Sequence, residues 1–178
     1  MAATHVALIR GINVGKANRV AMAELRAEVA KLGYRDVRTL LNSGNVIFAA
    51  PRASARTVAA RIEEVLDQRL GVPARVMVLG AAELREVVAD NPLVEVATDP
   101  SRLLVALPGD AAEISRLEPL SREKWAPEAL ALGRHAAYLW CPEGFIGSRV
   151  REAADRVLKD GFTTRNWATL LKLHALLS

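Results

Sequence analysis

Two polar loops hold the residues best suited to chemistry. Residues 10–19 read Arg-Gly-Ile-Asn-Val-Gly-Lys-Ala-Asn-Arg, residues 42–45 read Asn-Ser-Gly-Asn, and each loop adjoins an apolar run. Guanidinium, ammonium and amide groups bind anions, and glycine allows a ligand to approach the backbone closely. The loops therefore predict a site for a small anionic ligand, such as a nucleotide or another phosphate compound. The candidate residues in these loops are Arg10, Asn13, Lys16, Asn18, Arg19, Ser43 and Asn45.

A third polar group lies near the C-terminus. Arg165 and Asn166 precede Trp167, and Lys172 follows one and a half turns later if the segment is helical. These three side chains are further candidates for the same ligand. The alternative is that Trp167 belongs to the core and that its polar neighbours cap a helix.

The loops also have a purely structural interpretation. Asparagine and glycine are the residues that turns require where φ is positive, and asparagine side chains bond to nearby backbone groups. Arginine and lysine in a loop are often simply solvated. Turn chemistry and ligand binding both remain open from the sequence.

Motifs of well-known catalytic sites do not fit. Residues 11–17 resemble a P-loop, but only three residues separate the glycines and Ala17 follows the lysine where Ser or Thr should hold magnesium. Ser43 lies outside the G-x-S-x-G pattern of hydrolases. The three histidines and Cys141 lack the spacing of metal ligands. The sequence therefore predicts no metal and no cofactor, and it supplies no paired acid and base for an enzyme.

Composition narrows the class of protein. The chain has 178 residues, a formal net charge of +4 and a single cysteine, so it forms no internal disulfide. We expect a cytoplasmic protein because a reducing compartment suits one cysteine and the N-terminus lacks the pattern of a signal peptide. No apolar run reaches the roughly 18 residues that span a bilayer, so no membrane partner is expected. Basic residues are dispersed, which ranks nucleic acid below other partners.

Hydrophobic periodicity predicts the fold of the first half. We expect strands at 5–10, 37–41, 45–49 and 74–79, with helices at 22–32 and 58–70. This order is the βαββαβ pattern of ferredoxin-like folds. In that topology the first and second strands are parallel and finish at the same end of the sheet, so loops 10–19 and 42–45 should lie side by side.

The remainder partly repeats this pattern. We expect a helix at 81–89, a strand at 102–107, a short helix at 111–117, strands at 128–132 and 135–140, a helix at 148–158 and a last helix at 164–177. The prediction is an α+β protein with a ferredoxin-like half at 1–80, a helical linker at 81–100 and a second, partly repeated half at 101–178 packed with the first.

Several predicted strands are apolar at successive positions, for example 6–9 and 76–79. A sheet with one wet face would alternate instead, so the face without helices should be buried against the other half or a second subunit. A homo-oligomer is therefore possible. An RNA platform would need exposed aromatic residues on the central strands, and those strands offer only Phe48.

The sequence resembles a bacterial family of unknown function, domain-of-unknown-function family 1697. The resemblance rests on residues 6–15, Met22, Leu25, residues 37–39 and 43–46, Gly147, Ser148 and residues 164–173. It implies a small cytoplasmic α+β protein of ferredoxin-like topology and supplies no activity. The leading functional hypothesis is therefore a binding protein. Its alternatives are an oligomeric protein-interaction module and an enzyme acting on a phosphorylated small molecule.

Overall fold

The computed structural model describes residues 2–177 as a mixed α+β protein. Within those residues the chain forms two four-stranded antiparallel sheets with helices on them. The chain divides into two compact units, the first reaching Leu84 and the second beginning at Arg85. The predicted α+β class is confirmed. The finer division into 1–80, 81–100 and 101–178 stays a prediction.

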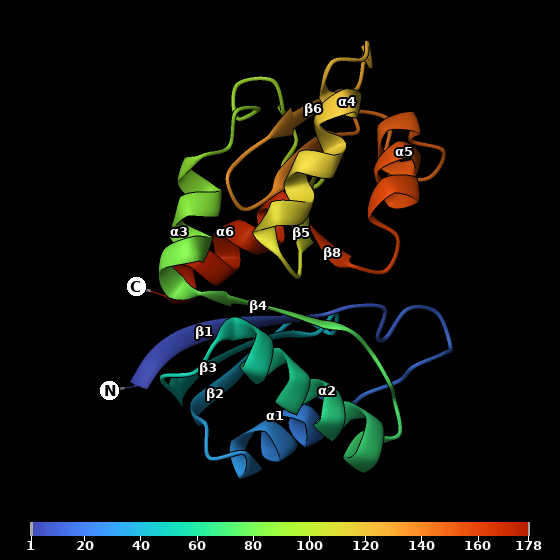
Figure 1. The fold of residues 1–178 in the computed structure, drawn as a ribbon. Helices are drawn as coiled ribbons and strands as arrows, with labels where there is room; N and C mark the ends of the chain where they lie inside the picture. Colours follow the sequence, from blue (N-terminus) through green and yellow to red (C-terminus); the bar gives the residue numbers. More distant parts are fainter. Residues whose placement is uncertain (1, 178) are drawn as a thin grey trace. The chain divides into compact units, whose positions relative to one another are not determined.

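The first unit is a complete βαββαβ motif (Figure 1). Its sheet has the strand order β2-β3-β1-β4, and β1 pairs antiparallel with both β3 and β4. The two helices lie together on one face of this sheet. The elements are β1 (Ala2–Ile9), α1 (Met22–Lys31), β2 (Arg35–Leu40), β3 (Asn45–Pro51), α2 (Ala55–Leu70) and β4 (Val76–Gly80).

Local signals explain where the helices of this unit begin and end. The side chain of Ser54 accepts a hydrogen bond from the Thr57 N–H at the start of α2. Gly71 ends that helix with a φ of 64°, a left-handed conformation that glycine adopts without steric cost. The buried positions Val58 and Ile62 recur at helical spacing and pack into the core.

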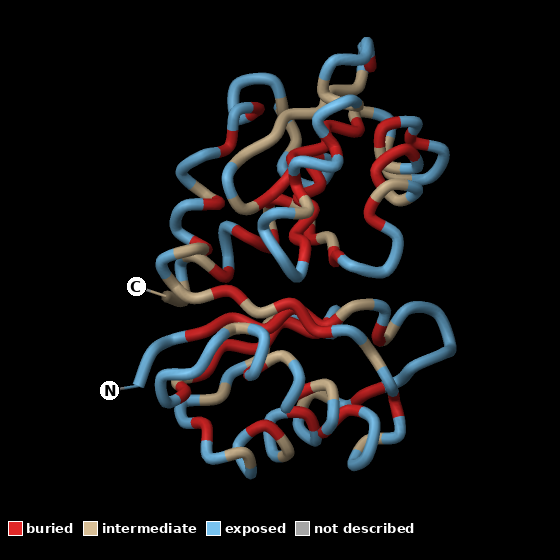
Figure 2. Tube along the Cα trace, in the orientation of Figure 1, coloured by how far each residue is buried: buried red, intermediate tan, exposed pale blue. Residues whose placement is uncertain are grey.

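Apolar residues at successive positions of β1 and β3 are buried, whereas β2 contains no buried residue. Ala7 and Ile9 belong to the core cluster under the helices. Val6 and Leu8 alternate with them and have no exposed surface. Figure 2 shows the central strands of each sheet as buried segments. Since neighbouring side chains on a strand point to opposite faces, residues on both faces of β1 are buried from Val6 to Ile9.

The second unit repeats the motif in full. Its sheet order, β6-β7-β5-β8, is equivalent to that of the first sheet. Its elements are α3 (Ala81–Ala89, which begins in the first unit), β5 (Leu103–Pro108), η1 (Ala111–Leu117), α4 (Glu118–Ser121), β6 (Ala129–Leu132), β7 (Ala137–Trp140), α5 (Arg149–Leu158), β8 (Phe162–Asn166) and α6 (Trp167–Leu176). No helix among residues 2–177 is long and apolar enough to cross a membrane.

The predicted helix at 164–177 was wrong at its start. Residues Phe162–Asn166 form strand β8, which pairs with β5, and α6 begins only at Trp167. Two β-branched threonines favour the strand, and Asn166 caps the helix by accepting from the Thr169 N–H at 2.9 Å. The missing strand completes the second half, so the partial repeat expected from sequence is a complete one.

Tyr138 ties the second sheet to α3. Its hydroxyl donates a hydrogen bond of 2.5 Å to the Val87 carbonyl, and burial raises its pKa well above the usual value. Its ring packs edge-on against Trp167, with ring centroids 6.4 Å apart. The hydroxyl therefore stays neutral and satisfies the buried Val87 carbonyl.

Tyr138→Phe should lower the free energy of unfolding by about 1–2 kcal/mol, because it leaves the Val87 carbonyl without its donor while the ring packing is kept. Urea denaturation measures this change. The matched control is Tyr34→Phe, whose hydroxyl makes no hydrogen bond within the described residues and whose ring stacks on Phe48. Equal losses in the two variants would show that the hydrogen bond contributes nothing.

Candidate functional site

The structure brings the two predicted loops together at one end of the first sheet. The Asn13 side-chain amide donates to the Asn42 carbonyl at 2.7 Å. The β1 ladder also continues past its last residue: the Ile9 N–H bonds to the Gly44 carbonyl at 2.9 Å, and the Arg10 N–H bonds to the Arg75 carbonyl at 2.9 Å. A third segment, the approach to β4, therefore lies at the same end.

Gly44 is the point of closest approach between the loops. It has a φ of 86°, and a β-carbon built there would lie 2.7 Å from Ile12 Cδ1 and 3.0 Å from Ile9 Cβ. Ile12 is buried and belongs to the core under the helices. Glycine at this position is thus required both by the backbone conformation and by space.

The asparagines of the first loop hold its shape. Asn13 and Asn18 have φ values of 55° and 53°, which asparagine tolerates better than most residues. The Asn13 N–H bonds to the Asn18 carbonyl, and the Val20 N–H bonds to the Asn13 side-chain oxygen. The amide of Asn18 reaches the Gly11 carbonyl at 3.3 Å. These amides act on the backbone, which supports the turn interpretation for both residues.

The second loop uses its polar residues in the same way. Asn45 is fully buried, and its amide donates to the Leu40 carbonyl at 2.8 Å and to Ser43 Oγ at 2.9 Å. Ser43 itself is exposed. The bonds of Asn45 close the turn between β2 and β3, so its primary role is to fix the hairpin.

The cations are placed differently from the amides. Lys16 and Arg19 are exposed and form no ion pair with any other described residue. Arg10 is half-buried at the start of the loop. Arg75, which sequence analysis missed, is two-thirds exposed and lies 3.8 Å from Glu63 Oε1 through its Nε. The predicted strand at 74–79 included Arg75, whereas β4 begins at Val76 and leaves Arg75 in the connecting segment.

Three connecting segments at this end of the sheet contain no acidic residue. They are residues 10–21, 41–44 and 71–75, and we call their combined surface the cationic loop surface. Its basic residues are Arg10, Lys16, Arg19 and Arg75. Glu63 lies beside Arg75 and also accepts a hydrogen bond from the Val76 N–H. Basic residues without acidic neighbours in the same segments give this surface a positive charge.

The other three candidate residues lie in the second unit. Arg165 is on β8 and is buried, and its guanidinium donates to Thr163 Oγ1 and the Thr164 carbonyl. Burial lowers the pKa of Arg165 to about 10, so it remains charged at neutral pH. Asn166 caps α6, and Lys172 is exposed on that helix. A ligand role for these residues stays a prediction.

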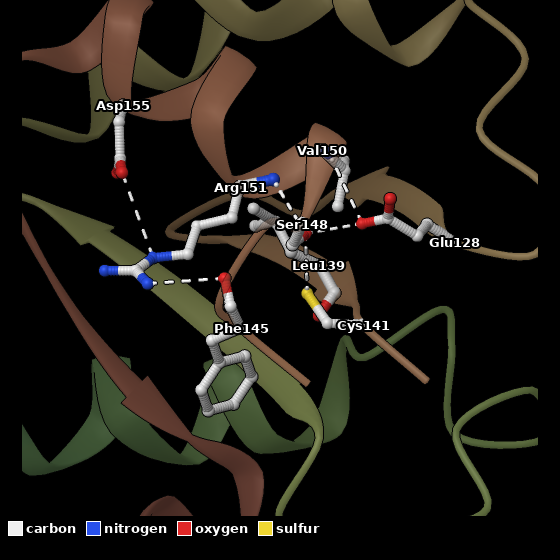
Figure 3. Close-up of polar contacts among 8 residues, drawn as sticks. All are labelled: Glu128, Leu139, Cys141, Phe145, Ser148, Val150, Arg151 and Asp155. Carbon is white, nitrogen blue, oxygen red and sulfur yellow. Dashed lines mark hydrogen bonds and ion pairs between the residues drawn. The ribbon is translucent and has the colours of Figure 1, made fainter. Parts of the chain in front are cut away.

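A second polar cluster surrounds the start of α5 (Figure 3). A cleft of about 210 Å³ is lined by Glu128, Cys141, Ser148 and Arg149, among others. The Ser148 hydroxyl donates a short hydrogen bond to Glu128 Oε2 and accepts one from the Arg151 N–H. Glu128 also accepts from the Arg149 N–H at 3.1 Å. A carboxylate of the protein itself therefore occupies the positive end of this helix.

The chemistry of this cluster is that of a helix cap. Cys141 is buried, and Sγ lies 3.3 Å from Ser148 Oγ. Burial raises the pKa of the thiol, with the charge of Glu128 acting in the same direction. A protonated, buried thiol is a poor nucleophile. Within residues 2–177 no group of three or more metal-binding side chains is assembled.

The fold and these loops define a protein with two ferredoxin-like halves and a basic connecting surface on the first. The family model described as "Protein of unknown function (DUF1697)" matches residues 2–138, and the chain belongs to this family. Its structure is similar to that of a conserved bacterial protein, SP0830 from Streptococcus pneumoniae. The two are 23% identical over the whole of both chains, with a TM-score of 0.81. This likeness shows the fold. No functionally curated protein matches the chain.

Gly44→Ala should destabilise the protein by about 2–4 kcal/mol, because it combines a left-handed residue with a clash against the core. The matched control is Gly15→Ala. Gly15 has a φ of 61° but nothing within 4 Å of a built β-carbon, so only the backbone cost of about 1–2 kcal/mol applies. Thermal denaturation compares the two. Similar losses of stability in the two variants would show that Ile12 can move away from a β-carbon at position 44 at little cost.

Cys141 should react with iodoacetamide far more slowly than an exposed cysteine at pH 8.5, where about half of an unperturbed thiol is ionised. Its pKa is higher in the folded state than in the unfolded state. The cysteine therefore favours folding below the unfolded pKa and loses that contribution as the pH rises through the folded pKa. Labelling with and without urea, followed by mass spectrometry, measures the difference. Rapid labelling of the native protein would contradict the buried, protonated thiol.

Proposed function

We propose that the protein is a binding protein whose anionic ligand is held at the cationic loop surface. The proposal is carried by one observation: three connecting segments that meet at one end of the first sheet bring basic residues and no acidic residue. Opposite charge in several segments attracts an anion, and each charged hydrogen bond contributes more than a neutral one. Phosphate compounds, including nucleotides, are the first ligands to consider.

The rigidity of the loops supports this role. Asn13, Asn45 and Gly44 fix the backbone by hydrogen bonds and by close packing, whereas Lys16 and Arg19 remain exposed. Functional residues are often found on loops that a rigid scaffold positions. A fixed backbone lowers the ordering cost of binding, because only side chains have to become ordered. We include a cytoplasmic location in the proposal, since the single cysteine is buried and needs no oxidising compartment.

The test measures binding of inorganic tripolyphosphate, ATP and a short glutamate peptide by titration calorimetry. Lys16→Ala combined with Arg19→Ala should weaken binding about ten-fold or more, because two charged contacts are lost. Neither side chain pairs with another described residue, so the thermal midpoint should hardly change.

The control removes the same charge from the other end of the first sheet. Arg52 follows β3, Arg56 lies in the first turn of α2, and both are exposed. Arg52→Ala combined with Arg56→Ala should leave binding unchanged. If both double variants weaken binding equally, the anion responds to net charge and not to a site in the loops. If the wild-type protein binds none of these anions, the proposed function is refuted.

A further inference from the structure

We infer that the partner at the cationic loop surface is an acidic protein segment that also carries apolar side chains. This inference rests on the proposed function and names its ligand class. It draws on exposed apolar residues that anion binding alone does not explain.

Val14 and Leu41 are the strongly exposed large apolar residues of the first unit, counted over its described residues 2–84. Their exposed fractions are 69% and 48%. Isolated exposed apolar side chains are common on protein surfaces. Here, however, both belong to the cationic loop surface, one in each of the two loops that meet.

The backbone holds these two residues in one neighbourhood. Val14 follows Asn13 and Leu41 precedes Asn42, and the 2.7 Å hydrogen bond from Asn13 to Asn42 joins the two loops at that point. Val14 also bridges to Ala17 across the turn that contains Lys16. The apolar side chain of Val14 and the charged side chain of Lys16 therefore both lie at the tip of the first loop.

Leu41 has an unusual backbone conformation. Its φ is 59°, and among the described residues it is the only apolar non-glycine residue with a positive φ. Left-handed backbone is unfavourable for a bulky side chain and easy for asparagine or glycine. The left-handed backbone opposes leucine at this position and 48% of its surface is exposed, so we attribute its presence to an external contact.

The chemistry of the surface favours a protein segment over other anions. Phosphate groups alone would meet the cations and leave the aliphatic side chains in water. Nucleic-acid bases are usually held by stacking on aromatic side chains, and residues 10–21, 41–44 and 71–75 contain none. Two aliphatic side chains are too few for stable anchoring to a lipid surface, which needs a larger apolar face. An acidic segment with aliphatic or aromatic side chains satisfies both the charge and the apolar contact.

The experiment compares two short fluorescein-labelled peptides by fluorescence anisotropy. Both are rich in glutamate; the first carries leucines, and the second has serine in place of each leucine. The wild-type protein should bind the first about ten-fold more tightly, since a buried apolar side chain at an interface commonly contributes that much. Leu41→Asn should remove most of this difference and leave binding of the serine peptide unchanged.

Stability separates a binding role from a structural role for Leu41. Asparagine tolerates the left-handed conformation, so Leu41→Asn should have a thermal midpoint equal to or above that of the wild-type protein. Val14→Thr keeps the shape of the side chain and should also weaken binding of the leucine peptide. The matched control is Val94→Thr, which alters a valine in the second unit that is 56% exposed.

The outcomes distinguish this inference from the proposed function. Equal binding of the two peptides, or no effect of Leu41→Asn, would overturn the inference while anion binding through Lys16 and Arg19 stands. If neither peptide binds, the inference fails, and tripolyphosphate binding alone decides the proposed function. Vesicles of phosphatidylserine with phosphatidylcholine and an oligouridylate are titrated in parallel. If Leu41→Asn weakens binding of the vesicles or of the oligouridylate more than binding of the leucine peptide, the partner is a membrane or RNA and not a protein.

Discussion

The pairing of β1 on both of its edges determines the arrangement of the candidate site. Because β1 runs antiparallel to β3 and to β4, the chain leaves β1 at the end of the sheet where β3 and β4 begin. The hydrogen bonds of Ile9 to Gly44 and of Arg10 to Arg75 extend this pairing into the connections. Three segments distant in sequence are thereby fixed side by side by backbone hydrogen bonds.

Amide and basic side chains have separate roles on this surface. Asn13 and Asn45 satisfy backbone carbonyls that the turns leave unpaired, which is the role expected of a buried or half-buried amide. Lys16 and Arg19 form no side-chain hydrogen bond or ion pair with another described residue. The structural interpretation therefore accounts for the amides, and a ligand role for the basic residues of the same segments stays a prediction.

The sequence predicted most of the fold because its helices show clear periodicity and its turns contain glycine and asparagine. The meeting of the two loops followed from topology once βαββαβ was recognised. Strand β8 was missed because only five residues separate its start from α6, too few to show alternation. Arg75 was missed because the predicted strand began two residues too early and included it. Glu128 was missed because it reaches the start of α5 from a position twenty residues away.

The second half of the chain shows that the fold alone does not require a basic end. At the equivalent end of its sheet the Gly109 N–H bonds to the Gly161 carbonyl, as the Arg10 N–H bonds to the Arg75 carbonyl in the first half. The connecting residues there include the acidic Asp110 and Asp160 beside the basic Arg134 and Lys159. Asp110 caps η1 by accepting from the Ala112 N–H, and Arg134 lies 3.7 Å from Glu86.

Charges at that end are thus mixed and are used within the unit. The same topology accommodates either composition, so the absence of acidic residues from the cationic loop surface is a property of its sequence and not a consequence of ferredoxin-like folding. The exposed Leu41 supports the same conclusion, because a turn selected for stability alone would place asparagine or glycine at its positive φ. Both departures occur in the first half, at the surface proposed to bind a partner.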